Sequence, residues 1–214
     1  MGLWLCGLLG VSGAAFAQQV PPPRVGFQMD IRTGYSIPMG NAFSGVAQSK
    51  LSDSVSGQVP VIVDIGGKVI PELFLGGYLG LGFGGVAGSI KQACDAINAS
   101  CLAVGVHLGV EAQYHILPGG SANPWLGYGL GLESLGFSIS QGNTTQSASY
   151  SGFEFARLSG GVDFRISRVF GIGPFIDLSL ARYSTFHDGN DDIELTNKAT
   201  HQWLTLGARA VIFP

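Results

Sequence analysis

The sequence has few charged residues and almost no net charge. Charged side chains make up 12% of the 214 residues, about half of the roughly 25% found in an ordinary soluble domain. The net charge of −3 provides no basic surface, so we expect no nucleic-acid partner. A chain with so little charge and 46% hydrophobic residues is also unlike an intrinsically disordered one.

Glycine is the residue in excess, with 34 of 214 positions against a typical ~7%. These glycines follow no three-residue period, which excludes a collagen-like chain. The mean hydropathy of +0.33 is high for a protein with a water-exposed surface. The composition therefore favours a chain whose exterior is not in water.

The N-terminus resembles a secretory signal. Residues 3–16 are uncharged and mostly apolar, and Ala15 and Ala17 are small residues at the positions that signal peptidase recognises. We therefore predict a signal peptide over 1–17 and one mature domain over 18–214. A short buried helix is the alternative interpretation of the apolar stretch.

Cysteine is scarce, and the predicted export of the chain decides how its three cysteines are interpreted. Cys6 is removed with the predicted signal, which leaves Cys94 and Cys101. An even number of cysteines in an exported chain favours a disulfide, here within a segment that reads as an exposed loop. A metal pair is the alternative, but no histidine or further cysteine lies nearby in the sequence.

Alternation of apolar and polar or glycine residues runs through the mature chain. The clearest stretch is 102–116, where leucine and valine alternate with glycine, histidine and glutamate. A period of two is typical of a β-strand. The uncharged run 73–90 could suggest a transmembrane helix, but its seven glycines would each cost a helix up to about 1 kcal/mol. The alternation predicts eight strands, at 25–36, 59–68, 73–83, 102–116, 126–133, 157–165, 176–181 and 204–212.

Three observations favour a barrel in a membrane over a soluble one. The strands are long enough to cross a bilayer at a tilt. Connections alternate between long polar and short ones, as in outer-membrane barrels. Aromatic residues gather near the strand ends, as they do at lipid–water interfaces. The long connections are 38–58, 84–101, 137–152 and 184–200, and the short ones are 69–72, 117–123 and 166–170. The aromatic residues are Phe27, Phe74, Tyr114, Trp125 and Phe175 near the short turns, and Tyr35, Phe83, Tyr183 and Trp203 near the long loops.

The fold class predicted is all-β, an eight-stranded antiparallel transmembrane up-and-down β-barrel. Phe153 and Phe155 break the alternation of the sixth strand, which indicates a bulge. A barrel of eight strands has an interior only wide enough for side chains. The charged inward positions carry both signs, so we expect a salt-bridged polar lumen and no water-filled pore. These lumen residues are Asp30, Arg32, Asp64, Lys68, His107, Glu111, Glu133, Arg157, Asp163, Arg165, Asp177 and Arg209.

These features together resemble the small outer-membrane β-barrel family that includes the OmpA transmembrane domain and OmpX. The C-terminal strand signal of that family is matched by Thr205, Gly207, Ala210 and Ile212, although the chain continues to Pro214 where members usually end on an aromatic residue. The resemblance implies outer-membrane lipid as the surroundings and the barrel-assembly machinery as a partner during biogenesis. The chain stops at the eighth strand, so the peptidoglycan tether of OmpA is not expected.

Patterns for catalysis or metal binding are weak. His107, Glu111 and His115 form an inward row that could carry metal or acid–base chemistry, but a pH-sensitive part of the polar interior is the simpler interpretation. Some small barrels are lipid A deacylases with a histidine, a serine and an acid near the outer leaflet. We nevertheless expect no catalytic residues, no metal site and no cofactor.

The last long connection also contains residues that could be catalytic or bind a metal, but their pattern supports neither role. His187 and His201 lie in or beside it with Ser184 close by, but sequence proximity alone does not make a triad. The acidic stretch 187–192 could attract Ca²⁺, yet it lacks the spacing and distal glutamate of an EF-hand.

Three classes of function remain open. The first is a non-enzymatic integral outer-membrane barrel with a structural or surface-interaction role through its outer loops, for a surface ligand that the sequence does not identify. The second is a lipid-modifying outer-membrane enzyme or a narrow gated channel. The third is a soluble lipocalin-like carrier, which would need an apolar lumen and a polar exterior.

Overall fold

The computed structural model describes residues 24–44, 50–188 and 191–214. The predicted signal peptide and Cys6 lie outside the described residues. Within the described ranges, no helix is long and apolar enough to cross a membrane.

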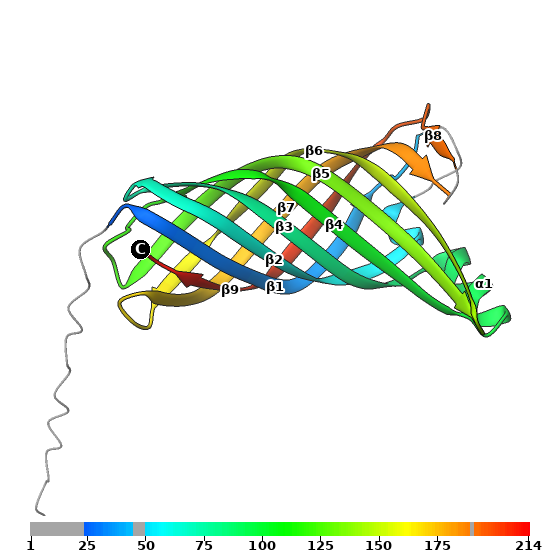
Figure 1. Ribbon diagram of the computed structural model, residues 1–214, viewed down its shortest axis with the longest axis horizontal. Coiled ribbons are helices and arrows are strands. Elements are labelled where there is room, and N and C mark those ends of the chain that lie inside the picture. The colour runs from blue at the N-terminus through cyan, green and yellow to red at the C-terminus, as the bar shows by residue number, and fades with distance from the viewer. Residues whose placement is uncertain (1–23, 45–49, 189–190) are drawn as a thin grey trace, which may run out of the picture.

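Eight long antiparallel strands form a closed barrel, as Figure 1 shows. Each strand pairs with the next along the chain, and the last pairs with both β7 and β1, which closes the ring. This confirms the predicted fold class. The strands are β1 (Gly26–Gly40), β2 (Val55–Ile70), β3 (Leu73–Val86), β4 (Ser100–His115), β5 (Ala122–Gln141), β6 (Thr144–Arg165), β7 (Phe170–His187) and β9 (Thr200–Ile212).

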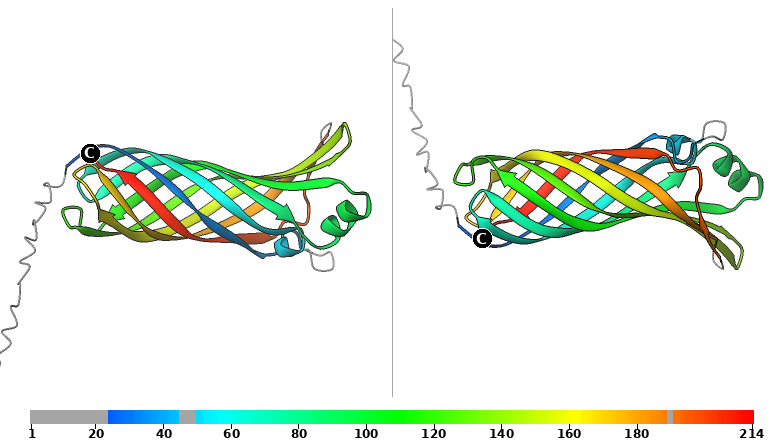
Figure 2. Two further views of the ribbon diagram at one scale, coloured as in Figure 1. Left: turned by 90° about the horizontal axis from the view of Figure 1, so that it is seen from below. Right: turned by 90° about the horizontal axis from the view of Figure 1, so that it is seen from above.

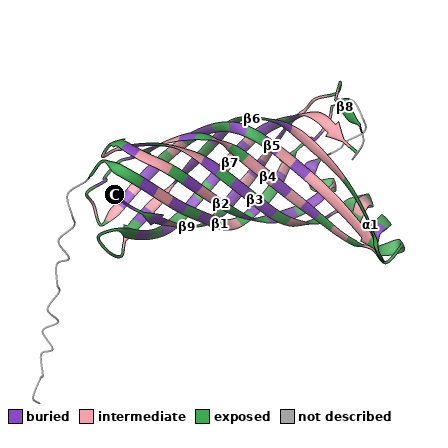
Figure 3. Ribbon diagram, in the orientation of Figure 1, coloured by how far each residue is buried: buried purple, intermediate pink, exposed green. Residues whose placement is uncertain are grey.

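The pleat of the strands makes exposed and buried residues alternate, which Figure 3 shows as bands along each strand. The exposed residues are largely apolar, and many of the buried ones are polar. Leu126, Leu132 and Val110 are each about 60% exposed on the outer wall. Interior positions are occupied by glycine and buried polar side chains. Such a continuous apolar exterior would be unfavourable in water, because apolar patches on soluble proteins are small. The outer wall is therefore a lipid-facing belt, which also excludes the lipocalin-like alternative.

A bulge in β6 confirms the predicted break in alternation. Phe153 and Phe155 point outward, and so does Leu158 three residues after Phe155. The pairing with β7 shifts by one residue between Glu154 and Ala156, which places the extra residue there. The lipid-facing Tyr128 hydroxyl donates a hydrogen bond to the carbonyl of Phe155 at 3.1 Å. This bond satisfies a backbone group at the bulge that lipid cannot satisfy.

The two ends of the barrel differ. Short turns and both ends of the described chain lie at one end, called here the turn end (Figure 1). The other, called the loop end, carries η1 (Leu51–Asp53), the helix α1 (Gly88–Ala96) and the short strand β8 (Asp192–Glu194), which pairs with β7. Figure 2 shows the same asymmetry from two further sides.

The predicted disulfide between Cys94 and Cys101 is present and joins α1 to the start of β4. The segment is not the exposed loop expected from its polar residues. Cys94 lies on a nine-residue helix and is 3% exposed, because it packs into the hydrophobic core at the loop end.

The predicted long loop 137–152 is also wrong. β5 and β6 continue past the barrel rim and pair as far as Gln141 and Thr144, so this connection is a long hairpin with a two-residue turn. Its serines, threonines and glutamines stand on strands that leave the membrane, where no apolar alternation is required. Polar composition therefore concealed the strand pattern.

The hydrophobic core lies at the loop end, inside the mouth of the barrel. Tyr183 and Trp203 form its floor, toward the polar interior, and residues of η1, α1 and the strand ends cover them. The buried members are Ala42, Leu51, Val55, Val86, Cys94, Ala103, Leu135, Tyr183 and Trp203. The mouth is thus closed by packed side chains.

Candidate functional site in the barrel interior and at the loop end

Most of the predicted lumen residues are buried inside the barrel. His107 has a side chain that is 12% exposed, and Arg165 is half-buried at the turn end. The others are at most 5% exposed. They are Asp30, Arg32, Asp64, Lys68, Glu111, Glu133, Arg157, Asp163, Asp177 and Arg209.

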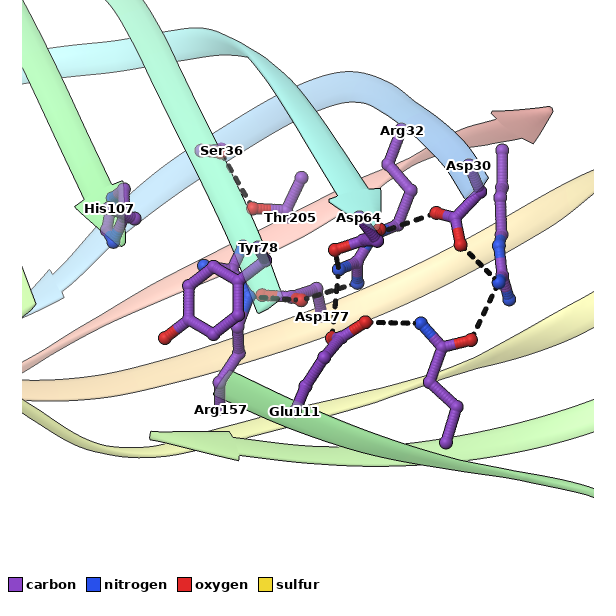
Figure 4. A network of polar contacts seen from close by, with 12 residues as sticks. Asp30, Arg32, Ser36, Asp64, Tyr78, His107, Glu111, Arg157, Asp177 and Thr205 are labelled. Atoms are coloured by element: carbon purple, nitrogen blue, oxygen red, sulfur yellow. Dashed lines mark hydrogen bonds and ion pairs between the residues drawn. The ribbon is translucent and has the colours of Figure 1, made fainter. Parts of the chain in front are cut away.

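Arg32 on β1 is the centre of the largest network, drawn in Figure 4. Its Nε and Nη2 donate to the two carboxylate oxygens of Asp64 at 2.7 and 2.6 Å. Nη2 also donates to Glu111 at 3.1 Å, and Nη1 to Asp177 at 3.3 Å. Bidentate, charge-assisted contacts of this kind are the strong ones in a water-excluded interior. One guanidinium thus joins β1 to β2, β4 and β7.

Arg209 on β9 continues the network toward the turn end. Its Nη2 donates to Asp30 at 2.5 Å and to the Gln113 amide oxygen at 2.6 Å. The Gln113 amide in turn donates to Glu111 at 2.5 Å, which links the two arginine centres. The Arg209 guanidinium stacks over the Trp125 ring at 4.1 Å, where a cation is attracted by the π-face.

Arg157 on β6 continues the network toward the loop end. Its Nε donates to Asp177 at 2.9 Å, and its Nη1 lies 3.5 Å from Glu154. The Tyr78 hydroxyl donates to Glu154 at 2.8 Å. Glu154 is not among the predicted lumen residues, because simple alternation from Arg157 places it outside. The bulge indicated by Phe153 and Phe155 was the signal that could have corrected this.

Lys68 and Arg165 close the turn end instead of joining the central network. Lys68 Nζ donates to the Pro71 carbonyl at 3.0 Å, and Arg165 Nη2 to the Pro118 carbonyl at 2.9 Å. Both cations face the ring of Phe213, at 5.9 and 4.0 Å from its centroid. Phe213 is itself only 3% exposed, so the C-terminal segment fills and closes this end of the barrel.

The row His107, Glu111 and His115 does not act as one unit. His107 Nδ1 lies 3.5 Å from Glu154, Glu111 is engaged by Arg32, and His115 Nδ1 lies 2.8 Å from the Asn123 amide. Each member has a separate partner on a different strand.

Glu133 on β5 organises a second, tighter cluster beneath the hydrophobic core. Its Oε1 accepts hydrogen bonds from the Tyr183 hydroxyl at 2.7 Å and from the Trp203 indole at 2.9 Å, and lies 3.1 Å from His201 Nε2. The Tyr183 and His201 rings stack at 4.0 Å. One carboxylate thus holds β5, β7 and β9 together at the floor of the closed mouth.

The interior has little free space at its middle level. A cavity of about 10 Å³ lies between the two clusters, lined by His107, Asp177 and Ser179 among others. That volume holds about one water molecule. Unpaired atoms of Gln58, Asp177 and Ser179 face this region and would be satisfied by such a water. At this level there is no room for a continuous column of water.

The aromatic residues predicted for the membrane interface divide into two sets. Phe27, Tyr35, Phe83 and Tyr114 are about half exposed on the outer wall, as expected. For the rest the prediction is wrong, because strand parity points them inward. Phe74 packs over glycines, Phe175 and Trp125 lie against interior arginines, and Tyr183 and Trp203 donate to Glu133. The inward residues are Phe74, Trp125, Phe175, Tyr183 and Trp203.

The histidines of the last loop lie in different surroundings. His201 is buried with Glu133, whereas His187 is on β7 beside Ser151 and Asp192. Ser184 instead donates to the carbonyl of Ser151. Part of the acidic stretch 187–192 lies outside the described residues, namely 189–190.

Comparisons with known proteins identify the fold. No family model and no curated protein matches the chain. Among solved structures, Neisserial surface protein A matches with a TM-score of 0.54 and 13% identity, over 89% of this chain and 99% of that one. The chain has the fold of a small outer-membrane β-barrel. With its lipid-facing belt it is an integral membrane barrel of the outer-membrane type.

Two further solved structures match over similar lengths. A major outer membrane protein from Thermus thermophilus has a TM-score of 0.49 at 13% identity, over 88% of this chain and 99% of that one. The attachment invasion locus protein Ail of Yersinia pestis has a TM-score of 0.45 at 12% identity, over 86% and 97%. In barrels of this type the long loops face the outside, so the loop end is the outer end.

Proposed function

We propose that this outer-membrane barrel has a surface-interaction role, carried out by its outer end. The observation that carries the proposal is the β5–β6 hairpin. On its β6 side the hairpin extends beyond β7, which among the described residues pairs with β6 only as far as Ser149. Residues 144–148 of β6 therefore form an open strand edge, whereas β5 remains paired with β4 as far as Ser140. Open edges are sites where a further strand can add.

A pocket beside this edge supports the same role. It has a volume of about 590 Å³ and lies between the hairpin and the end of β7. Phe137 and Ile139 provide an apolar floor, and Gln146 and Asp188 provide polar groups. A few polar groups over an apolar floor are typical of binding sites. The filled interior, by contrast, favours neither a carrier nor an open channel.

The test is to shorten the hairpin. Replacing residues 138–147 by Asn-Gly preserves the Phe137–Ala148 register and builds a turn suited to a two-residue hairpin loop. The intact and shortened proteins, in lipid nanodiscs, would be compared for binding to arrays of purified surface proteins and glycans. We expect binding by the intact protein that is lost on shortening. Equal binding by both would contradict the proposal.

We further propose that export and assembly use the two ends of the sequence. The apolar segment 3–16 supports secretion, and β9 carries Thr205, Gly207, Ala210 and Ile212 for the barrel-assembly machinery. Gly207→Ala tests whether β9 carries the assembly signal. Because Gly207 also contacts β1 closely, refolding of the variant in vitro must be measured beside its assembly in cells. A variant that refolds in lipid but fails to assemble in cells would support it.

A further inference from the structure

Three side chains at the outer end form a hydrogen-bonded chain in the order of a nucleophilic triad. Ser151 Oγ lies 3.0 Å from His187 Nε2, and His187 Nδ1 lies 2.5 Å from Asp192 Oδ1. A serine bonded to one ring nitrogen of a histidine, with an acid on the other nitrogen, is the arrangement that activates a serine hydroxyl.

The backbone explains why residues so far apart in sequence meet. Ser151 is on β6, and the β6–β7 register shifts by one residue beside it, so that Thr185 opposes Ser151 and His187 opposes Ser149. The β7–β8 hairpin then places Asp192 directly opposite His187. Opposed side chains share a face of the sheet, so the three groups stand together.

That face is the outer one, away from the barrel interior. Ser151 has the same parity as the outward Phe153, two residues along a regularly paired stretch of β6. The His187 side chain is 36% exposed and that of Asp192 is 77% exposed. Unlike the buried histidines of the lumen, this histidine can reach a substrate.

The position of the triad along the strands indicates that its substrate is a lipid. Phe153 on β6, Leu132 on β5 and Leu180 on β7 are the last apolar side chains of the lipid-facing belt before outward positions become polar. Ser151 is the next outward residue after Phe153. The triad thus stands at the boundary between lipid and water, where the ester groups of membrane lipids lie.

We propose that Ser151 and His187 are catalytic residues, positioned by Asp192, that hydrolyse acyl esters of phosphate-bearing lipids in the outer leaflet. Arg182 supports the phosphate, because it opposes Phe153 on the same face at the lipid boundary. A guanidinium there is placed to bind a lipid phosphate while the acyl chain lies along the apolar belt. This activity goes beyond the surface-interaction role and replaces the expectation of no catalytic residues.

The reaction balances with water as the only co-reactant. Ser151 Oγ forms a bond to the ester carbonyl carbon while its proton passes to His187 Nε2, and the ester C–O bond then breaks as the leaving alcohol takes that proton. Water attacks the acyl-serine in the same way and releases a fatty acid. Asp192 accepts the Nδ1 proton of His187 in a hydrogen bond and keeps Nε2 free to accept. The Thr185 hydroxyl, opposite Ser151 on the same face, supplies a donor for the transient oxyanion.

The first test is covalent labelling of the full chain in detergent micelles with a fluorophosphonate probe, which forms a bond to an activated serine with loss of fluoride. We expect mass spectrometry to find the label on Ser151. Ser151→Ala should abolish it and His187→Gln should reduce it strongly. Ser149→Ala is the matched control, since Ser149 is the neighbouring outward serine on β6 and should not change labelling. Heat-dependent gel migration verifies that each variant is folded.

The second test measures turnover of a p-nitrophenyl acyl ester. Ser151→Ala and His187→Gln should each lose about 10³-fold or more in kcat, and the double variant should be no worse, because the two act as a unit. Asp192→Asn should lower kcat with little change in KM, and Asp192→Glu should restore part of it. A merely structural Asp192 would not produce that split.

The third test identifies the lipid. Vesicles of glycerophospholipid and vesicles containing lipid A would be assayed separately for released fatty acid. Arg182→Gln should raise KM for whichever phosphate-bearing lipid is cleaved, but not for the uncharged p-nitrophenyl ester. If the folded wild type neither labels at Ser151 nor cleaves any of these esters faster than Ser151→Ala, the proposal is wrong, whereas binding through the hairpin would be unaffected.

Discussion

At the scale of single residues, the largest contributions to folding stability are expected from buried groups that each form hydrogen bonds or ion pairs with several partners. Glu133 does so beneath the hydrophobic core, where donors from β7 and β9 converge on one carboxylate oxygen. Arg32 does so at the centre of the lumen with carboxylates from three strands. Removing one partner from such a cluster leaves buried polar groups without compensation.

Glu133→Ala should therefore lower the free energy of unfolding by about 3–5 kcal/mol, the range for breaking a buried ionic cluster. Glu133→Gln retains an acceptor oxygen and should lose less. Urea unfolding in lipid vesicles measures both. A loss for Glu133→Ala no larger than that for an exposed acid such as Glu194→Ala, whose side chain is 81% exposed, would show that the cluster contributes little.

Glycine provides the space for interior aromatic side chains. An added Cβ at Gly131 would lie 2.6 Å from the Tyr78 hydroxyl and closer still to the Leu108 carbonyl oxygen. Gly131→Ala should lower the free energy of unfolding by about 1–3 kcal/mol, as overpacking does. Gly136 on the same strand is the control, because its Cβ would meet atoms no nearer than 3.8 Å. Similar losses at both positions would contradict the explanation.

At the scale of elements, irregularities in β6 and β7 decide which side chains meet. The bulge near Phe155 brings Glu154 into the interior with Arg157, and the register shift at Ser151 brings His187 beside it. Neither contact follows from strict alternation.

The bulge leaves the Phe155 carbonyl in need of a hydrogen-bond donor from the protein, because lipid cannot provide one. Tyr128→Phe removes the hydroxyl that donates to the Phe155 carbonyl and should cost about 1–3 kcal/mol, the cost of an unsatisfied buried group. Tyr114→Phe is the control, since Tyr114 also faces outward but lies at the turn end of β4. Unfolding in vesicles gives both values, and equal losses would argue against a role in the bulge.

The disulfide should matter to α1 and little to the barrel. It closes a loop with a sequence separation of only 7, so the entropic stabilisation is at the low end. After reduction, or in a Cys94→Ser, Cys101→Ser variant, we expect trypsin to cleave at Lys91 on α1 while heat-dependent migration of the barrel is unchanged. Resistance at Lys91 in the reduced protein would show that packing alone holds the helix.

At the scale of the whole molecule, closing the sheet accounts for both compositional features. Lipid accepts the uncharged outer wall, and closure leaves no open backbone edge within the membrane. The interior receives the remaining charges, which pair across the barrel, and glycines leave room for Tyr78 and Phe74.

A filled barrel should not conduct ions. Core residues close the mouth, the central cavity holds about one water, and Phe213 closes the turn end. We expect planar-bilayer recordings of the wild type to show no current steps above background. Reproducible current steps that change when Arg32 is replaced by alanine would contradict this expectation.

The sequence was sufficient for the parts of this protein that depend on period and composition. Alternation with period two follows directly from the pleat, so strand number, the lipid-facing side and most lumen residues could be predicted. The disulfide and the bulge could be predicted too. Strand ends beyond the membrane could not, because no lipid imposes apolar alternation on the β5–β6 hairpin.

Side-chain partners were decided only by the tertiary structure. Which carboxylate meets Arg32, which aromatic residues turn inward, and whether Ser151 reaches His187 all depend on register between strands distant in sequence. Register shifts of one residue change every facing pair. Composition and period thus determined the barrel and its membrane, while register determined its network, its closed mouth and the proposed triad.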